Sequence, residues 1–236
     1  MDETQKSIIE RLQPYTTGIL LCSHDISLYS SCDVSDALCK LKVTNGGFLS
    51  GLTMWSPVRQ EGQTKIIGPA YTVKYVAVDS PEPKLTSHYI DSVPDGSVVF
   101  VSSPKTPNAV YGGLMTHRAR ARGAVGAVID GRFRDLQEHR DVQFPIFGRD
   151  VGTSPPYETV KVAAINAAVG LQTPDQDITI HPGDYIIADL NGVVVLPSDL
   201  AEKAIPLMAK QVEADTKVME ALDNGMGFTE AVKRFR

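Results

Sequence analysis

The sequence predicts a single-domain α/β protein. Two runs of apolar, mostly β-branched residues, SVVFVS at 97–102 and AVGAVID at 124–130, have the composition and length of buried strands. Segments whose apolar residues recur at helical spacing lie at both ends of the chain, above all residues 197–222. No internal repeat or low-complexity linker divides the 236 residues, and a 42% hydrophobic composition can enclose a full core. One compact α/β domain with helical ends follows.

The first part of the chain is expected to be helical. Residues 3–13 place their apolar side chains on one side of a short amphipathic helix. A second helix is expected over residues 32–41, with Ser31 or Asp33 as its N-terminal cap. The Asn-Gly-Gly sequence at 45–47 would end it.

The middle of the chain supplies most of the expected strands. Residues 66–79 are rich in β-branched and aromatic side chains and are bounded by turn residues, which indicates strand structure. A short helix is expected within residues 80–93, before the strand at 97–102. A helical or irregular stretch at 135–142 then leads to a further strand at 144–150.

The last part of the chain combines a hairpin with a long helix. Residues 177–197 have strand patterning, and the Asn-Gly pair at 191–192 is a strong signal for a hairpin turn. Residues 197–222 then predict one amphipathic helix, capped by Ser198 or Asp199.

The composition limits the possible partners. A formal net charge of -5 and a pI near 5.5 leave no basic stripe, so we expect no nucleic-acid partner. The three cysteines lack CxxC spacing and the five histidines are scattered, which gives no metal-knuckle pattern. Without an apolar signal core or a run of eighteen apolar residues, we expect a cytoplasmic protein with no membrane partner.

A glycine pair precedes a helix-like segment in the middle of the chain. Gly112 and Gly113 lie directly before residues with helical spacing, and Gly123 suits the C-terminal end of that helix. The start of a helix presents unpaired N–H groups and a partial positive charge, and glycine lets a ligand approach the backbone closely. The pattern therefore predicts a site for a carboxylate.

An arginine and an aspartate follow the strand expected at 124–130. Ligands of α/β proteins commonly bind at the carboxyl ends of strands, so Arg134 and Asp135 could lie beside the glycine pair. The arginine fork suits a carboxylate or an enolate, and a single aspartate suits Mg²⁺ or Mn²⁺, which keep several waters. From spacing alone, a packing role for the glycines and a solvated surface pair for Arg134 and Asp135 remain open alternatives.

Several motifs in a fixed order resemble the RraA-like family, which includes class II 4-hydroxy-4-methyl-2-oxoglutarate aldolases and bacterial regulators of RNase E activity. The aldolase signature is an acidic residue, twenty further residues and then Arg-Asp. One position departs from that signature, because Gly113 stands where the aldolases have the acidic residue. The matching segments are VSDAL at 34–38, GPAYTVK at 68–74, GGLM at 112–115, RG at 122–123, VIDG at 128–131, RD at 134–135 and HPGDYIIADLNGVVVLP at 181–197.

The resemblance implies a fold and a reaction. It implies a β/β/α swivelling-type fold over residues 31–200, with a helical extension over 1–30 and a helical segment over 201–236. It also implies a divalent-metal-dependent lyase that forms a pyruvate enolate, by retro-aldol cleavage of 4-hydroxy-4-methyl-2-oxoglutarate or by decarboxylation of oxaloacetate. Backbone N–H groups would hold the carboxylate of the 2-oxo acid, Arg134 would stabilise the enolate and Asp135 would bind Mg²⁺ or Mn²⁺. The N–H groups are those of Gly112, Gly113, Leu114 and Met115.

The resemblance further implies a homo-oligomer, a trimer or a hexamer, in which a neighbouring subunit's glutamate completes the metal shell. Glu213 is the candidate for that glutamate, with Glu202 and Glu220 as rivals. Arg132 could contact a distal carboxylate of a dicarboxylic substrate, and the segment 149–157 could shape the outer pocket.

Three other functions remain as alternatives. The first is a non-catalytic interaction protein of the RNase E regulator type. The second is a methyltransferase, for which the chain has no early glycine-rich nucleotide loop. The third is a Schiff-base aldolase that would use Lys74.

Overall fold

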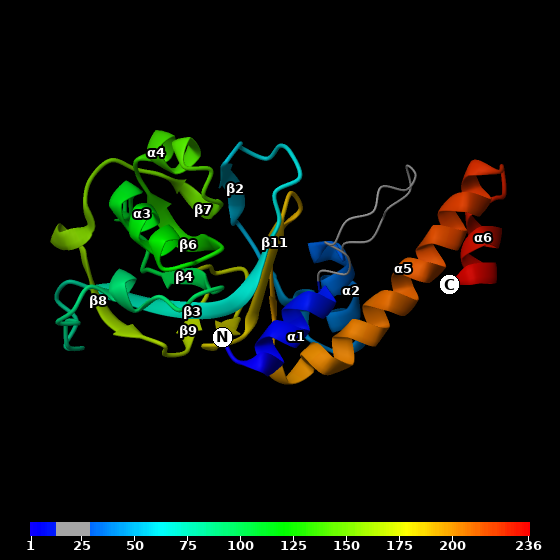
Figure 1. Cartoon of the computed structure of the whole chain (residues 1–236), viewed down its shortest axis with the longest axis horizontal. Helices are drawn as coiled ribbons and strands as arrows, with labels where there is room; N and C mark the ends of the chain where they lie inside the picture. The colour runs from blue at the N-terminus through cyan, green and yellow to red at the C-terminus, as the bar shows by residue number, and fades with distance from the viewer. Residues whose placement is uncertain (13–28) are drawn as a thin grey trace.

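The computed structural model describes residues 1–12 and 29–236 and shows the α/β fold expected from the sequence (Figure 1). A ten-stranded sheet runs in the order β1-β12-β11-β3-β4-β6-β7-β2, with β5 paired to β6 and β8 paired to β3. A separate pair joins β9 and β10. The strands are β1 (Phe48–Leu49), β2 (Thr53–Ser56), β3 (Ile66–Ala77), β4 (Val98–Ser102), β5 (Ala109–Tyr111), β6 (Gly126–Phe133), β7 (Ile146–Val151), β8 (Val160–Ile165), β9 (Val169–Gly170), β10 (Thr179–Ile180), β11 (Tyr185–Asp189) and β12 (Gly192–Leu196).

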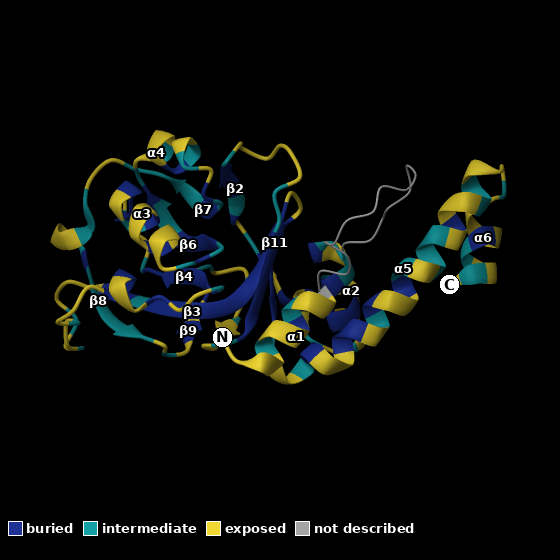
Figure 2. Cartoon of the chain, viewed as in Figure 1, coloured by how far each residue is buried: buried dark blue, intermediate teal, exposed yellow. Residues whose placement is uncertain are grey.

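The parallel part of the sheet consists of β3, β4, β6 and β7. Nearly every residue of β3 and all of β4 are buried, because both faces of this part are covered and the sequence is continuously apolar (Figure 2). The four strands expected from the sequence are confirmed with shifted ends. β6 continues to Phe133 instead of stopping at Asp130, because the short strand β5 pairs with its last residues.

The antiparallel part joins the same sheet through β3. The first residues of β3 pair with β11, and β11 pairs with β12 over five residues that end at Asp189 and Gly192. The hairpin expected at 191–192 is confirmed, with Leu190 and Asn191 as its two connecting residues.

Helices cover this antiparallel part on its outer face. A cluster of buried side chains joins the sheet residues Ile67, Ile187 and Val194 to Leu38 of one helix and Met208 of another. The second half of the longest helix extends away from the sheet, and the last helix folds back on it (Figure 1). The helices of this side are α1 (Glu3–Leu12), α2 (Ser31–Lys40), α5 (Ala201–Asp223) and α6 (Phe228–Phe235).

The expected helix caps are corrected by the structure. Ser30 is the cap of α2, because its side chain accepts the Asp33 N–H while Asp33 accepts the Ser30 N–H in return. A 3₁₀ turn at Ser198–Leu200 precedes α5, so neither Ser198 nor Asp199 caps that helix.

Two helices cover the parallel part of the sheet on the opposite side of the molecule. They are α3 (Gly113–Ala121) and α4 (Leu136–Asp141), and they pack with the 3₁₀ turn at Tyr89–Ser92 over Val101 and Ile129. A second apolar cluster, which includes Phe100 and Val193, lies between the two parts of the sheet. The resulting layers agree with the β/β/α arrangement.

Two further observations concern single residues and the membrane. Cys32 and Cys39 are free and exposed, whereas Cys22 and His24 lie outside the described residues.

Among the helices of the described residues, none combines the length and apolar character that crossing a bilayer requires.

Candidate active site

Helix α3 begins directly after β5 with a glycine as its cap. Gly112 has extended backbone angles and no side-chain cap bond is made. The Gly113 N–H donates to Asp135 Oδ2 at 2.9 Å, and the Met115 N–H donates to the Gly112 carbonyl at 3.0 Å. Among the described residues, the N–H groups of Gly112 and Leu114 have no partner. Two of the four backbone donors expected from the sequence are therefore already used within the chain.

Arg134 and Asp135 lie against this helix start, as the sequence predicts. The Arg134 N–H donates to the Tyr111 carbonyl at 2.9 Å, which holds the end of β6 beside β5. Asp135 has φ +64°, a left-handed conformation that is uncommon outside glycine and that tends to occur at functional sites. Its side chain is 33% exposed and lies 3.5 Å from Arg134 Nε.

Position 112 requires glycine, because the side chains of Asp135 and Arg134 lie close to its backbone. A Cβ there would lie 2.8 Å from Asp135 Oδ2 and 3.3 Å from Arg134 Nε. Any larger residue at position 112 would push the carboxylate and the guanidinium away from the helix start.

A carboxylate that the sequence analysis did not single out also lies at this corner. A Cβ on Gly113 would lie 1.7 Å from Glu138 Oε2, so the Glu138 carboxylate occupies the space above Gly113. Glu138 follows Asp135 by three residues and lies in the first turn of α4. This spacing, which places two side chains on one side of a helix, was the signal that could have identified it.

The Asp135 carboxylate has the chemistry of a ligand for a hard divalent cation, and the Glu138 carboxylate lies next to it at the same corner. The two carboxylates lie against consecutive residues, Gly112 and Gly113. The described part of the chain has no cluster of three or more His, Cys, Asp or Glu side chains with metal-binding geometry. One carboxylate is enough for Mg²⁺ or Mn²⁺, because these ions retain waters and accept substrate oxygens, whereas an all-protein cage would need more ligands.

A buried histidine supports the backbone of the same corner. The ring Nε2 of His139 lies 2.7 Å from the Arg134 carbonyl oxygen, and Nδ1 is buried without a partner. Burial lowers the pKa of His139 below its usual value, because removal from water penalises the charged ring more than the hydrogen bond to the Arg134 carbonyl favours it. His139 therefore fixes the position of Arg134 as a neutral donor.

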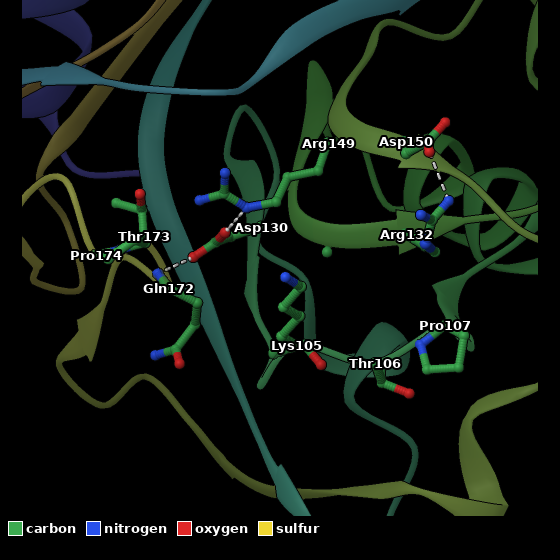
Figure 3. Close-up of a pocket in the computed structure, with 12 residues that line it drawn as sticks. Lys105, Thr106, Pro107, Asp130, Arg132, Arg149, Asp150, Gln172, Thr173 and Pro174 are labelled. Carbon is green, nitrogen blue, oxygen red and sulfur yellow. Dashed lines mark hydrogen bonds and ion pairs between the residues drawn. The ribbon is translucent and has the colours of Figure 1, made fainter.

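A cavity of about 640 Å³ lies elsewhere at the same edge of the sheet (Figure 3). Arg132 and the start of the segment 149–157, both singled out in the sequence as parts of an outer pocket, line it, whereas the glycine pair, Arg134 and Asp135 do not. Lys105, Arg132, Arg149, Asp130 and Asp150 are its charged lining residues. The uncharged ones are Ser103, Thr106, Pro107, Gly131, Gln172, Thr173 and Pro174.

Asp130 is the buried centre of this cavity wall. Its Oδ1 accepts from Arg149 Nε at 2.6 Å, and its Oδ2 accepts the Gln172 N–H at 2.5 Å. Burial raises the pKa of Asp130, and these two donors oppose the rise. The carboxylate thus connects β6 to β7 and to the segment after β9.

The remaining residues singled out in the sequence lie apart from the α3 corner within this chain. Glu213 is exposed on α5 and pairs with Lys217 at 2.6 Å, and Glu202 pairs with Arg11. Glu220 lies on the outer half of α5, which points away from α3 (Figure 1). Lys74 pairs with Glu82 at 2.7 Å, so its amine is engaged in an ion pair and gives no support to a Schiff base.

Comparison with known proteins identifies relatives over about three quarters of the chain. The family model named RraA-like, described as Aldolase/RraA, matches residues 31–195. Protein DlpA from Legionella pneumophila is 31% identical over 179 residues, which cover 75% of this chain and 27% of that protein. A protein from Halalkalibacterium halodurans, provisionally named 4-hydroxy-4-methyl-2-oxoglutarate aldolase, is 28% identical over 73% of this chain and 79% of its own length.

A solved structure shows the same fold over nearly the whole chain. An uncharacterised protein from Pseudomonas syringae pv. tomato superposes with a TM-score of 0.75 at 27% identity, covering 96% of both chains. The chain spans about a quarter of the length of Protein DlpA, so that relative's full activity does not transfer to it.

Proposed function

The chain belongs to the RraA-like family, and we propose that it is a divalent-metal-dependent lyase that acts on 2-oxo acids. The observation that carries the proposal is the meeting of Gly112, Arg134 and Asp135 at the start of α3. The relative provisionally named as an aldolase supports the same reaction class. Retro-aldol cleavage of 4-hydroxy-4-methyl-2-oxoglutarate and decarboxylation of oxaloacetate are the candidate reactions, because both give the pyruvate enolate.

In this proposal, the substrate carboxylate binds the free N–H groups of Gly112 and Leu114. Asp135 would hold Mg²⁺ or Mn²⁺, which would supply a Lewis acid when bound, and the Glu138 carboxylate would stay free to accept a proton. The C–C bond breaks and its electron pair moves into the enolate, whose 2-oxo oxygen receives hydrogen bonds from the Arg134 guanidinium. Protonation of the enolate carbon then gives pyruvate.

The two candidate reactions differ in their need for a base. Retro-aldol cleavage must also remove the proton of the 4-hydroxyl group, whereas decarboxylation releases carbon dioxide without such a proton transfer. We propose that Glu138 is the base that accepts this proton, because its carboxylate lies against the Gly113 backbone. Glu138 thereby supplies the acidic group that the aldolase signature would place at residue 113.

Assembly belongs to the same proposal. A homotrimer or homohexamer would bring a glutamate of a neighbouring subunit, with Glu213 as the candidate, to the Asp135 corner. Light scattering coupled to size-exclusion chromatography measures the assembly directly. A monomer that is fully active would contradict this part of the proposal.

The reaction is tested by pyruvate release from oxaloacetate and from 4-hydroxy-4-methyl-2-oxoglutarate with Mg²⁺. We expect EDTA to stop both reactions, and Arg134→Ala and Asp135→Ala to lower kcat/KM by about 100-fold or more. Arg120→Ala is the control, because this exposed arginine lies on the same helix and outside the site. Turnover that is indifferent to EDTA and to both substitutions would refute the proposal.

The alternative of an interaction protein of the RNase E regulator type has one observation in its favour, the absence of a carboxylate at Gly113. Its test is a stable complex with an RNA-processing partner in a pull-down. Such a complex, together with inactivity on both substrates, would favour it.

A further inference from the structure

We propose that the cavity lined by Lys105, Arg132 and Arg149 is a second site, which binds a small oxyanion such as a carboxylate or a phosphate. It lies at the carboxyl ends of β4, β6 and β7, where α/β proteins commonly bind ligands. At about 640 Å³ it is large enough for a small metabolite.

The acceptor groups of the cavity are already used within the chain. Both oxygens of Asp130 accept hydrogen bonds from Arg149 and Gln172. Both oxygens of Asp150 are also engaged: Oδ2 accepts from Arg132 Nη1 at 2.6 Å, and Oδ1 accepts the N–H of Val151 at 2.8 Å. A cation would therefore find no free carboxylate here.

The donor groups are not used up. Arg132 binds Asp150 and the Val151 carbonyl through Nη1 alone, so its Nε and Nη2 have no partner among the described residues. The same holds for the Lys105 ammonium group, which has no hydrogen bond or ion pair in the described part of the chain. Figure 3 shows the Lys105 side chain below the Asp130–Arg149 pair, with the Arg132–Asp150 pair to its upper right. The groups that remain free are thus positively charged hydrogen-bond donors. An oxyanion, which carries negative charge and accepts hydrogen bonds, is the ligand that suits them.

The wall that carries Lys105 is held in place before any ligand binds. Thr106 Oγ1 donates to Thr159 Oγ1 at 3.0 Å, and Asn108 Nδ2 donates to the Pro155 carbonyl at 2.6 Å. The Ala109 N–H donates to the Ser154 carbonyl at 2.8 Å. These bonds connect the segment between β4 and β5 to the segment after β7, so that binding does not have to order it.

The site is separate from the proposed lyase site in its residues. Neither the glycine pair nor Arg134, Asp135 or Glu138 lines the cavity. The proposal thus does not depend on the lyase reaction, and the two can fail independently.

Calorimetric titration of the full-length protein with inorganic phosphate and, separately, with succinate tests the proposal. We expect one of the two anions to bind, and Lys105→Ala to weaken that binding by about tenfold or more. Lys105→Arg should retain it within about threefold, because the charge and the donors persist. The anion that binds identifies the ligand class. Because Lys105 is exposed, neither substitution removes a core contact.

Two controls locate the binding. Lys203→Ala removes an exposed lysine on α5 and should leave the affinity unchanged. Arg134→Ala should also leave it unchanged, even though it abolishes the lyase reaction. Absence of binding by both anions, equal binding by Lys105→Ala, or a loss caused by Arg134→Ala or Lys203→Ala would each overturn the proposal.

Discussion

Two aspartates five residues apart at the end of β6 have opposite environments. Asp130 has a fully buried side chain, and each of its oxygens accepts a hydrogen bond within 2.6 Å. Asp135 has a side chain that is one-third exposed, one backbone donor at 2.9 Å, and Arg134 Nε at 3.5 Å. The chain satisfies the first carboxylate completely and leaves the second open to a ligand.

This difference separates structural from chemical roles more clearly than residue type does. Both aspartates belong to motifs that match the family, VIDG and RD, and both lie next to an arginine in space. Only Asp135 combines a strained left-handed backbone with unused acceptor capacity. We therefore assign Asp130 to stability and Asp135 to catalysis.

The largest expected effect is a loss of stability on substitution of Asp130, the aspartate that we assign to a structural role. Asp130→Ala should lower the free energy of unfolding by about 3 kcal/mol, because it leaves Arg149 without its partner in a largely buried place. Asp135→Ala should lower it by under about 1 kcal/mol, because the group is partly exposed and weakly paired. Urea unfolding followed by circular dichroism measures both. Equal losses of stability would remove the distinction between the two aspartates.

The next effect concerns the carboxylate beside Asp135. Glu138→Gln should lower retro-aldol turnover by about 100-fold and leave oxaloacetate decarboxylation within about threefold, because only the first reaction needs a base. Steady-state assays of both reactions on the same preparation measure this ratio. A parallel loss in both reactions would show that Glu138 acts on binding or folding and not on the proton.

A relocated carboxylate sharpens this test. Gly113→Asp alone should displace Glu138, since a Cβ at residue 113 meets its carboxylate at 1.7 Å. In the double variant Gly113→Asp with Glu138→Ala the clash is absent, and retro-aldol activity should exceed that of Glu138→Ala alone. Additive losses in the double variant would contradict the assignment of Glu138.

The sequence was sufficient for the central strands and for the meeting of the glycine pair with Arg134 and Asp135. Continuous apolar runs bounded by turn residues predict buried parallel strands well, and Asn-Gly correctly predicted the hairpin of β11 and β12. The three-residue strand β5 and the six-residue strand β8 were not predicted, because pairing with β6 and β3 creates them more than local propensity does.

The sequence singled out Arg132 and the segment 149–157 for an outer pocket, but it did not predict that Lys105 and Gln172 would complete the cavity. Lys105, Arg132 and Gln172 are far apart along the chain and meet only because three strand ends and two connecting segments converge. Glu138 was missed for another reason, since its significance depends on the space left by the hydrogen atom of Gly113.

The smallest expected effect is a pH dependence of stability, to which the buried histidine beside Asp135 and the buried Asp130 contribute with opposite signs. His139 bonds the Arg134 carbonyl as a neutral ring, and burial lowers its pKa below 6.5. Below pH 6.5 the unfolded chain gains a proton that the folded chain does not take up, so the free energy of unfolding should fall as the pH drops. Asp130 has the opposite sign in a more acidic range, because burial raises its pKa above 3.8 and the folded chain is the first to take up that proton. Urea unfolding from about pH 7.5 to about pH 5.5 should show a slope that His139→Gln flattens and that His181→Gln, at an exposed site before β11, retains. A slope unchanged in His139→Gln would mean that the α3 corner is not held by a neutral histidine.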